Sequence, residues 1–359
     1  MLAKYPQMIE FLEIPQLLNN CIRTFYYDDA LKICNFITRF CTRYRSMAPI
    51  FENMLAEIDK SKDIMIAQIL KEMNTNVQLP VCMKLIDYLR QTDRFTEEQL
   101  RVNFLLARDV WFQAAINKNT AVVNCKLQFL FYFQLKPPFP FLAFTYISSI
   151  TEVFRINIFD IVTQYRAIFP DIDSIEGQKK GLPMAGRAGN EYHNHKIINS
   201  WLLFKIEHYL RMLRTSLDAS LQQASILPLD TVIDHCFYFG LSMSKIGADI
   251  RPQLILIFNR FIASRFQLRV EEANRKFEKS IGDIFKTVKR QSSAQQQQEG
   301  GTFEATLEQF PLVLAYHNDI CATFSEIKNN VPLCLFASFT AVLNASFQQI
   351  VKHTTDYIR

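Results

Sequence analysis

The sequence predicts an all-α protein, and three observations support this fold class. Apolar residues recur every three or four positions along most of the 359 residues, which is the period of an α-helix. Glycine (9) and proline (13) are few for this length, which disfavours a loop-rich or all-β fold. No segment shows a convincing strand pattern, and no repeat of fixed period occurs. We therefore expect irregular helix hairpins stacked into an elongated helical rod.

Residues 1–118 are predicted to form an N-terminal helical bundle, in which Val77–Phe112 is the best-defined hairpin. Pro80 suits the first turn of its first helix, where a missing N–H costs nothing. Thr96 and Gln99 have the spacing of a capping box at the start of the second helix. Because Trp111 and Phe112 continue the apolar stripe of that helix, we expect both to pack against the helix Tyr146–Phe169 and Trp111 to be buried.

Residues 119–144 form an apolar, proline-containing segment that is predicted to be an insertion between a helix ending near Asn117 and one starting near Thr145. Its prolines forbid one continuous helix, and its apolar run is shorter than the ~20 residues of a membrane span. We expect Leu127–Phe144 to be the least well-defined part of the fold. Its Phe/Leu/Pro-rich composition also suits a translated intron end, which sequencing the mature transcript across Asn119–Tyr146 would test.

The remaining chain is predicted to comprise a central helical bundle at residues 145–290 and a C-terminal helix pair at 303–359. Within the central bundle, residues 171–190 contain several glycines and are predicted to be a flexible linker. Residues 291–302 are rich in Ser, Gln and Gly and are predicted to be a low-complexity linker.

No catalytic, cofactor-binding or metal-binding residue is predicted. The loop Gly181–Ala188 has the glycine spacing of a phosphate-binding loop but lacks its lysine and hydroxyl residue. His193 and His195 point to different sides of a helix start and have no further ligands at a readable spacing. Adjacent acids such as Glu97 and Glu98 are interpreted as helix caps and solvated faces.

Charge and cysteine content narrow the class of protein further. Basic residues between Arg265 and Lys279 alternate with glutamates, which predicts a salt-bridged helix surface and no nucleic-acid partner. The alternative for this stretch is a weak contact with anionic lipid. The eight cysteines show no CxxC or zinc spacing, and residues 1–20 do not read as a signal peptide. We therefore expect reduced, mostly buried thiols in a cytosolic protein.

Four long segments resemble the subunit 8 family of the conserved oligomeric Golgi complex. They follow one another in the same order as in that family, and they are Glu10–Leu31, Asn76–Trp111, Ile156–Asp171 and Cys236–Leu254. Family members also have a helical region before the segment matching Phe11 and continue past the point matching Arg359. We therefore expect the chain to lack those parts, of which the first is associated with subunit assembly.

The resemblance implies a non-enzymatic tethering subunit without cofactors, peripheral on the cytoplasmic face of the Golgi membrane. The family acts in intra-Golgi retrograde vesicle tethering, Golgi organisation and protein transport. The implied partners are the other subunits of the complex, vesicle fusion and coat factors, and the membrane. The exposed faces of Glu10–Leu31 and Cys236–Leu254 are candidate contact surfaces, although packing alone also explains these segments. The alternatives are a scaffold of another membrane-traffic tether and a helical hydrolase or lipid transferase.

Overall fold

The computed structural model describes the backbone of residues 5–44, 50–132, 139–170, 188–221, 229–288, 311–329 and 331–358. Within these ranges every regular element is a helix and there is no strand, which confirms the predicted all-α class. The chain divides into two compact units. Unit 1 comprises residues 1–121 and 153–206, and unit 2 comprises residues 122–152 and 207–359. These units interleave along the sequence. The boundaries predicted for the N-terminal bundle, the central bundle and the C-terminal helix pair stay predictions.

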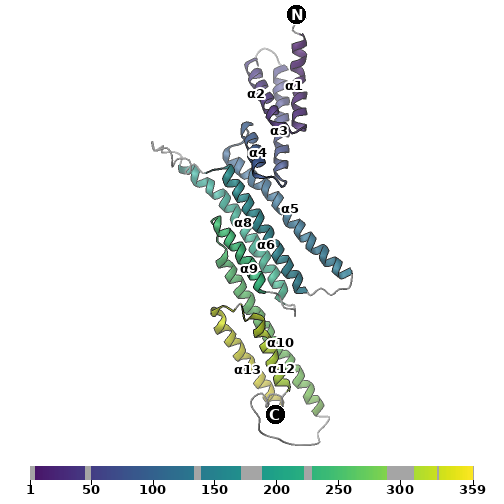
Figure 1. Cartoon of the computed structure of the whole chain (residues 1–359), viewed down its shortest axis with the longest axis vertical. Coiled ribbons are helices and arrows are strands. Elements are labelled where there is room, and N and C mark those ends of the chain that lie inside the picture. Colours follow the sequence, from purple (N-terminus) through teal and green to yellow (C-terminus); the bar gives the residue numbers. More distant parts are fainter. Residues whose placement is uncertain are drawn as a thin grey trace. The chain divides into compact units, whose positions relative to one another are not determined.

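Unit 1 begins with three helices that pack side by side: α1 (Tyr5–Arg23), α2 (Tyr27–Tyr44) and α3 (Ile50–Met73) (Figure 1). The fourth helix, α4 (Leu79–Gln91), packs on α2 and α3. Each helix buries one apolar stripe, because no single amphipathic helix can remove its own stripe from water. The buried side chains include Leu18, Ile22, Cys34, Ile37, Cys41, Ile58, Met65 and Ile69.

The predicted hairpin Val77–Phe112 is confirmed. Pro80 lies in the first turn of α4, and α5 (Glu97–Tyr132) follows a turn in which Asp93 has a positive φ of 54°. The capping box forms in both directions: Thr96 N donates to Gln99 Oε1 at 2.9 Å, and Gln99 N donates to Thr96 Oγ1 at 3.3 Å. Local sequence therefore determines where α5 begins.

Within unit 1, α5 packs against parts of α6 (Phe139–Ile168) and α8 (Ala188–Leu221). The Phe112 and Phe154 rings meet edge to face with centroids 5.0 Å apart, which joins α5 to α6. Asp109 on α5 pairs with Lys205 on α8 and accepts a hydrogen bond from Trp201 Nε1 at 3.3 Å. The Lys205 side chain is only 3% exposed, so its charge is removed from water and held by this carboxylate.

The prediction that Trp111 is buried is wrong, since the side chain is only half-buried. Phe112, the next residue, is fully buried and takes the place in the core. The guanidinium carbon of Arg108 lies 4.0 Å from the centre of the Trp111 ring. The indole therefore covers a buried cation and keeps one side in water, an arrangement that a cation–π contact favours.

The expected helix boundaries around the apolar segment are also corrected. Helix α5 continues past Asn117 to Tyr132, because no glycine or proline interrupts it, and α6 already begins at Phe139. Pro140 is tolerated there because it falls in the first turn. Residues 133–138 and the side chains of 124–143 lie outside the described residues, and so does most of Leu127–Phe144. The predicted linkers at 171–187 and 291–302 also lie outside them, whereas residues 188–190 begin α8.

Unit 2 is built on α10 (Arg251–Val288), which packs against α9 (Leu229–Lys245), α12 (Pro311–Ile327) and α13 (Phe336–Ile358). A short 3₁₀ turn, η2 (Leu333–Leu335), precedes α13. Phe266 on α10 is fully buried and stacks on Phe339 of α13 with ring centroids 4.2 Å apart. It also meets Phe324 of α12 at 5.5 Å, so one aromatic cluster joins the three helices.

Gly240 does not interrupt its helix. It lies inside α9 and is buried against α10. A Cβ at this position would lie 2.8 Å from Cγ of Arg251, so the missing side chain lets the two helices approach closely. Gly247 does end the helical segment, with a φ of +90° in the turn between α9 and α10.

Arg108 joins three parts of unit 1. It is fully buried and donates from Nη1 to the carbonyl oxygens of Thr75 at 2.7 Å and Met73 at 3.3 Å. Its Nη2 lies 3.8 Å from a carboxylate oxygen of Asp160 on α6. Burial lowers the pKa of Arg108 and raises the pKa of Asp160, each against the attraction of the other.

Replacing this arginine should destabilise unit 1 selectively. We expect Arg108→Ala to lower its free energy of unfolding by about 2–4 kcal/mol, because buried carbonyls lose charged donors and a cavity remains. Trp111 and Trp201, the two tryptophans of the chain, both belong to unit 1, so denaturation followed by tryptophan fluorescence reports on this unit.

The control is Arg94→Ala, which removes a surface pair with Asp59 at 3.1 Å. This exposed pair should contribute less than about 1 kcal/mol. Equal losses for the two variants would contradict the role assigned to Arg108.

Candidate interaction surfaces

The first segment indicated by the resemblance, Glu10–Leu31, forms the corner between α1 and α2. Ile22 and Tyr27 are buried there and hold the two helices together. Phe25 has a positive φ of 63° and is 59% exposed, and its neighbour Tyr26 is 65% exposed. An exposed aromatic pair at a tight corner is a candidate contact surface, whereas the rest of the segment is packing.

The other candidate contact segment, Cys236–Leu254, forms the corner between α9 and α10. Most of its apolar residues are buried; these are Cys236, Phe239, Met243, Ile246, Ile250 and Leu254. Tyr238 and Leu241 remain exposed on the outer side of α9. The need for two closely packed helices therefore accounts for most of this segment, including Gly240.

Potential metal ligands do not gather among the described residues, which contain no group of three or more His, Cys, Asp or Glu side chains that could hold a metal ion. Cys321 and His317 lie 3.5 Å apart on an exposed face of α12 without a described third group. Residues 181–187 and the side chains of His193 and His195 lie outside the described residues.

The adjacent acids act as predicted at helix starts. Asp28 accepts a hydrogen bond from Tyr88 Oη at 3.0 Å, and Asp29 pairs with Lys32 at 3.0 Å. Glu97 pairs with Arg90 of the preceding helix at 2.8 Å. These carboxylates therefore have partners within unit 1.

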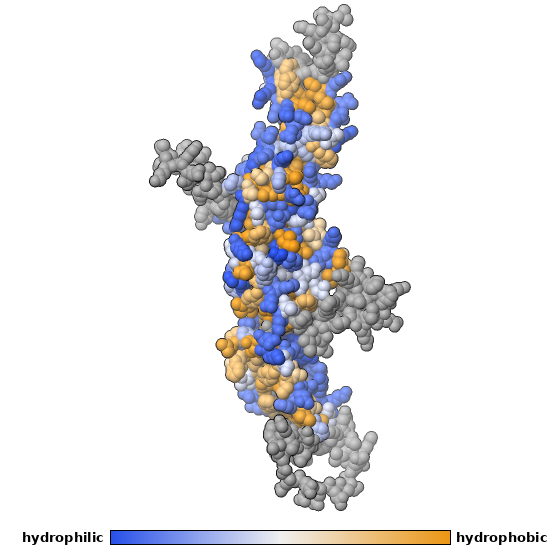
Figure 2. Space-filling model, in the orientation of Figure 1, coloured by the Kyte–Doolittle hydropathy of each residue, from blue (hydrophilic) through white to orange (hydrophobic). Residues whose placement is uncertain are grey.

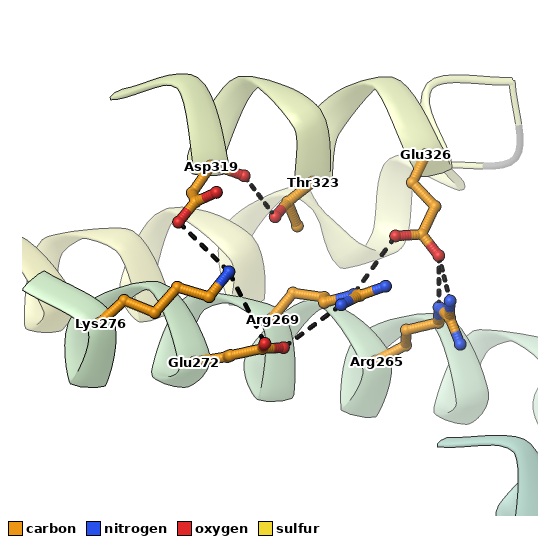
Figure 3. A network of polar contacts seen from close by, with 7 residues as sticks. All are labelled: Arg265, Arg269, Glu272, Lys276, Asp319, Thr323 and Glu326. Carbon is orange, nitrogen blue, oxygen red and sulfur yellow. Dashed lines mark hydrogen bonds and ion pairs between the residues drawn. The ribbon is translucent and has the colours of Figure 1, made fainter. Parts of the chain in front are cut away.

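A charged network joins α10 to α12 in unit 2 (Figure 3). Glu326 on α12 accepts from Arg265 Nε at 2.6 Å and lies 3.4 Å from Arg269 Nε. The side chains of Arg265 and Glu326 are only 5% and 11% exposed, so this pair is buried. At the more exposed end of the network, Lys276 lies 3.5 Å from Asp319.

The network confirms the predicted salt-bridged helix surface, and it adds a partner that the sequence pattern did not indicate. Arg269 and Lys276 do pair with Glu272 on their own helix, at 3.2 and 3.7 Å. The most buried partner is Glu326, which lies 61 residues from Arg265 in sequence. No local spacing signals such a pair. The sequence of α10 shows several arginines, but it does not indicate which residue of another helix pairs with them.

The cysteines are free thiols in the part of the chain where side chains are described, as expected for reduced residues. Four are buried (Cys34, Cys41, Cys82 and Cys236), whereas Cys321 and Cys334 are exposed and Cys21 is intermediate. Burial raises the pKa of Cys34 and that of Cys236 to about 11 each. Both therefore stay protonated near neutral pH.

The outer face of α13 is an apolar surface of unit 2 that is open to solvent. Its inner face packs on α10 through Phe339 and Ser346, while Phe336 is 70% exposed and Val351 is 64% exposed. Figure 2 shows side chains of high hydropathy gathered over this helix. Residues 333–355 are also long and apolar enough to cross a membrane, and 11% of the most apolar window is buried. Length and composition alone do not separate a membrane span from a protein contact.

The model of the Dor1-like family matches residues 1–126 and 143–275. The chain belongs to the Dor1-like family. The residues between the two matched parts, 127–142, fall inside the segment interpreted as an insertion. Both helix corners described above lie within the matched parts.

Curated relatives carry the name conserved oligomeric Golgi complex subunit 8. The protein from Bos taurus is 32% identical over 98% of this chain, and the one from Homo sapiens is 31% identical over 98%. The protein from Drosophila melanogaster is 30% identical over 100% of the chain. The alignments cover 53%, 54% and 59% of these relatives, so the chain spans little more than half their length. No solved structure matches.

Removing Glu326 should loosen α12 in this member of the Dor1-like family. We expect Glu326→Ala to cost about 3–5 kcal/mol, because it leaves Arg265 buried without its carboxylate. Amide hydrogen exchange should speed up across Pro311–Ile327 while α1–α4 keep their protection.

Two further variants separate lost pairing from lost packing. Asp319→Asn removes a half-exposed pair and should change exchange little. Combining Arg265→Met with Glu326→Leu should recover much of the lost protection, since an apolar pair can replace a buried ion pair. Unchanged exchange in Glu326→Ala would contradict a structural role for the network.

Thiol reactivity should divide the cysteines by burial. At pH 7.5 iodoacetamide should modify Cys321 and Cys334 rapidly and leave Cys34 and Cys236 unmodified in the folded protein, as read by peptide mass spectrometry.

The buried thiols of Cys34 and Cys236 should make the free energy of unfolding fall at alkaline pH. Their folded pKa of about 11 lies above the ordinary value of 9.0, so the unfolded chain loses these protons first. The contribution of these two thiols to the free energy of unfolding is fully present below about pH 9 and is lost as the pH rises through about 11. Substituting both residues with Ala should flatten this part of the stability profile.

Proposed function

We propose that the chain is a non-enzymatic subunit of the conserved oligomeric Golgi tethering complex. It acts in intra-Golgi retrograde vesicle tethering, Golgi organisation and protein transport, as a peripheral protein on the cytoplasmic face of the Golgi membrane. The observation that carries this proposal is about 30% identity along nearly the whole chain to proteins named as subunit 8 of that complex.

The physical role is to hold partners together. Its partners are the other subunits, vesicle fusion and coat factors, and the membrane, with no nucleic acid among them. A tether of this kind keeps two membranes and their fusion factors within reach, which raises their effective concentration without making or breaking a bond. Long helices with apolar outer faces suit this task, because a partner helix can add to them as a further layer.

The outer face of α13 is the surface we assign to subunit contact. Between Leu333 and Thr355, Lys352 is the only Asp, Glu, Lys or Arg residue, and His353 follows it. Depletion of charge and exposure of aromatic side chains are typical of the centre of a protein–protein interface. His353 is already paired with Glu278 on α10 at 2.9 Å, so it belongs to the inner side.

Co-purification tests the proposed membership. A tagged copy of the chain expressed in cells should recover the other subunits of the Golgi complex and should colocalise with a Golgi marker. Failure to recover any of them, from cells in which the chain is soluble and folded, would contradict the proposed function.

The α13 contact is tested in the same experiment. Phe336→Glu combined with Val351→Glu should reduce recovery of the subunits by about tenfold or more, because charge is placed in an apolar interface. The matched control is Gln348→Glu with Lys352→Ala, which changes exposed polar residues on the same helix. If neither double variant lowers the recovery of the subunits, α13 is not the contact surface, and membership of the complex still stands.

A further inference from the structure

A small groove lies between the C-terminal half of α8 and the N-terminal half of α10, within unit 2. Its volume is about 190 Å³. The base is formed by Leu217 of α8 and by Ile257 and Phe261 of α10, all of which are buried. Leu256 stands at the edge and is 70% exposed. The groove is thus a concave apolar surface next to a projecting apolar side chain.

Two arginines flank this groove from different helices. Arg214 extends from α8 and Arg260 from α10, and both are exposed. Among the described residues neither has an ion-pair partner, whereas two nearby arginines of unit 2 do. Arg211 pairs with Glu207 at 3.7 Å, and Arg251 pairs with Asp249 at 2.6 Å. The single acid in the lining, Asp218, leaves an excess of positive charge.

The size and chemistry of the groove indicate what it can hold. Small-molecule pockets usually enclose about 300–1,000 Å³, so this groove is suited to one large apolar side chain and not to a whole ligand. Arginine recognises carboxylates with two parallel hydrogen bonds, which gives direction as well as affinity. An apolar anchor flanked by carboxylates on both sides would therefore satisfy every group that lines the groove except Asp218.

We propose that this groove binds an acidic amphipathic helix of a partner protein. One Leu, Phe or Met of that helix fills the space over Ile257 and Phe261 and packs on Leu256. Asp or Glu residues one turn before and after the anchor pair with Arg214 and Arg260. This is helix-in-groove recognition, in which anchors repeat at helical spacing and charges fix the register.

Two other occupants fit less well. An anionic membrane surface is typically bound by clusters of four to eight basic residues, whereas two arginines flank this concave site. A second copy of the chain docking through the same groove would place the arginines of each copy near those of the other, because a twofold contact uses one surface twice. Charge complementarity therefore favours an acidic peptide.

The proposal does not rest on the function proposed above. Peptide binding is measured with the purified chain alone, while membership of the Golgi complex is measured by co-purification from cells. Either result can fail without the other.

A phage-displayed library of random 16-residue peptides, selected on the immobilised 359-residue chain, tests the proposal. We expect the enriched peptides to share one large apolar residue with Asp or Glu three or four positions away on both sides. Synthetic versions should bind the chain in fluorescence anisotropy, and replacing their anchor by Ser should abolish binding.

Charge reversal locates the binding site. Arg214→Glu with Arg260→Glu should weaken binding of these peptides by about tenfold or more, and Leu256→Ser should weaken it as well. The matched control is Arg275→Glu with Lys279→Glu, two exposed cations farther along α10, which should leave affinity unchanged. Circular dichroism spectra must show that all variants keep their helix content.

Three outcomes would overturn the proposal. The selection could enrich no acidic peptides, or the enriched peptides could bind the groove variant as tightly as the original chain. Vesicles containing phosphatidylserine could also bind the chain through Arg214 and Arg260 while no peptide does. That last result would assign the groove to a lipid surface instead.

Discussion

Buried cations fix how the long helices of this protein pack. An apolar stripe alone leaves the register of two helices weakly defined, because a slip by one turn still brings apolar side chains together. A buried charge permits no such slip, since it must keep its partners or lose several kilocalories per mole. Arg108 requires the carbonyl groups of Met73 and Thr75, and Lys205 requires Asp109. In unit 2, Arg265 requires Glu326 in the same way. The apolar cores form around these fixed points.

Some charged groups are paired across helices, as Arg265 is with Glu326 and Lys205 with Asp109, and the buried thiols of Cys34 and Cys236 are protonated at neutral pH. What remains available is surface: the uncharged outer face of α13 and the basic groove between α8 and α10. Both features suit recognition of other helices, one through apolar contact and the other through charge as well. Membership of the Dor1-like family is consistent with this emphasis on surfaces.

Sequence reasoning succeeded where the cause is local. The capping box at Thr96 and Gln99, the first-turn proline at position 80 and the stripe of α4 each depend on neighbours within one or two turns. It failed where the outcome depends on another helix. Trp111 and Phe112 were both expected to pack on α6; this is confirmed for Phe112, whereas Trp111 is only half-buried. No local pattern explains Gly240, which lies inside α9 where Arg251 approaches closely. The residues lining the basic groove come from two helices and share no sequence motif.

The sequence by itself determined the all-α class, most helix positions and the family resemblance. Helical periodicity, helix caps and long similar segments can all be recognised along a single chain. The tertiary structure decided which helices meet, which charges are buried and which apolar residues stay open to solvent. The physical reason is that burial and ion pairing depend on distances between residues far apart in sequence. Arg265 and Glu326 are separated by 61 positions, yet they share one hydrogen-bonded contact that neither local pattern reveals.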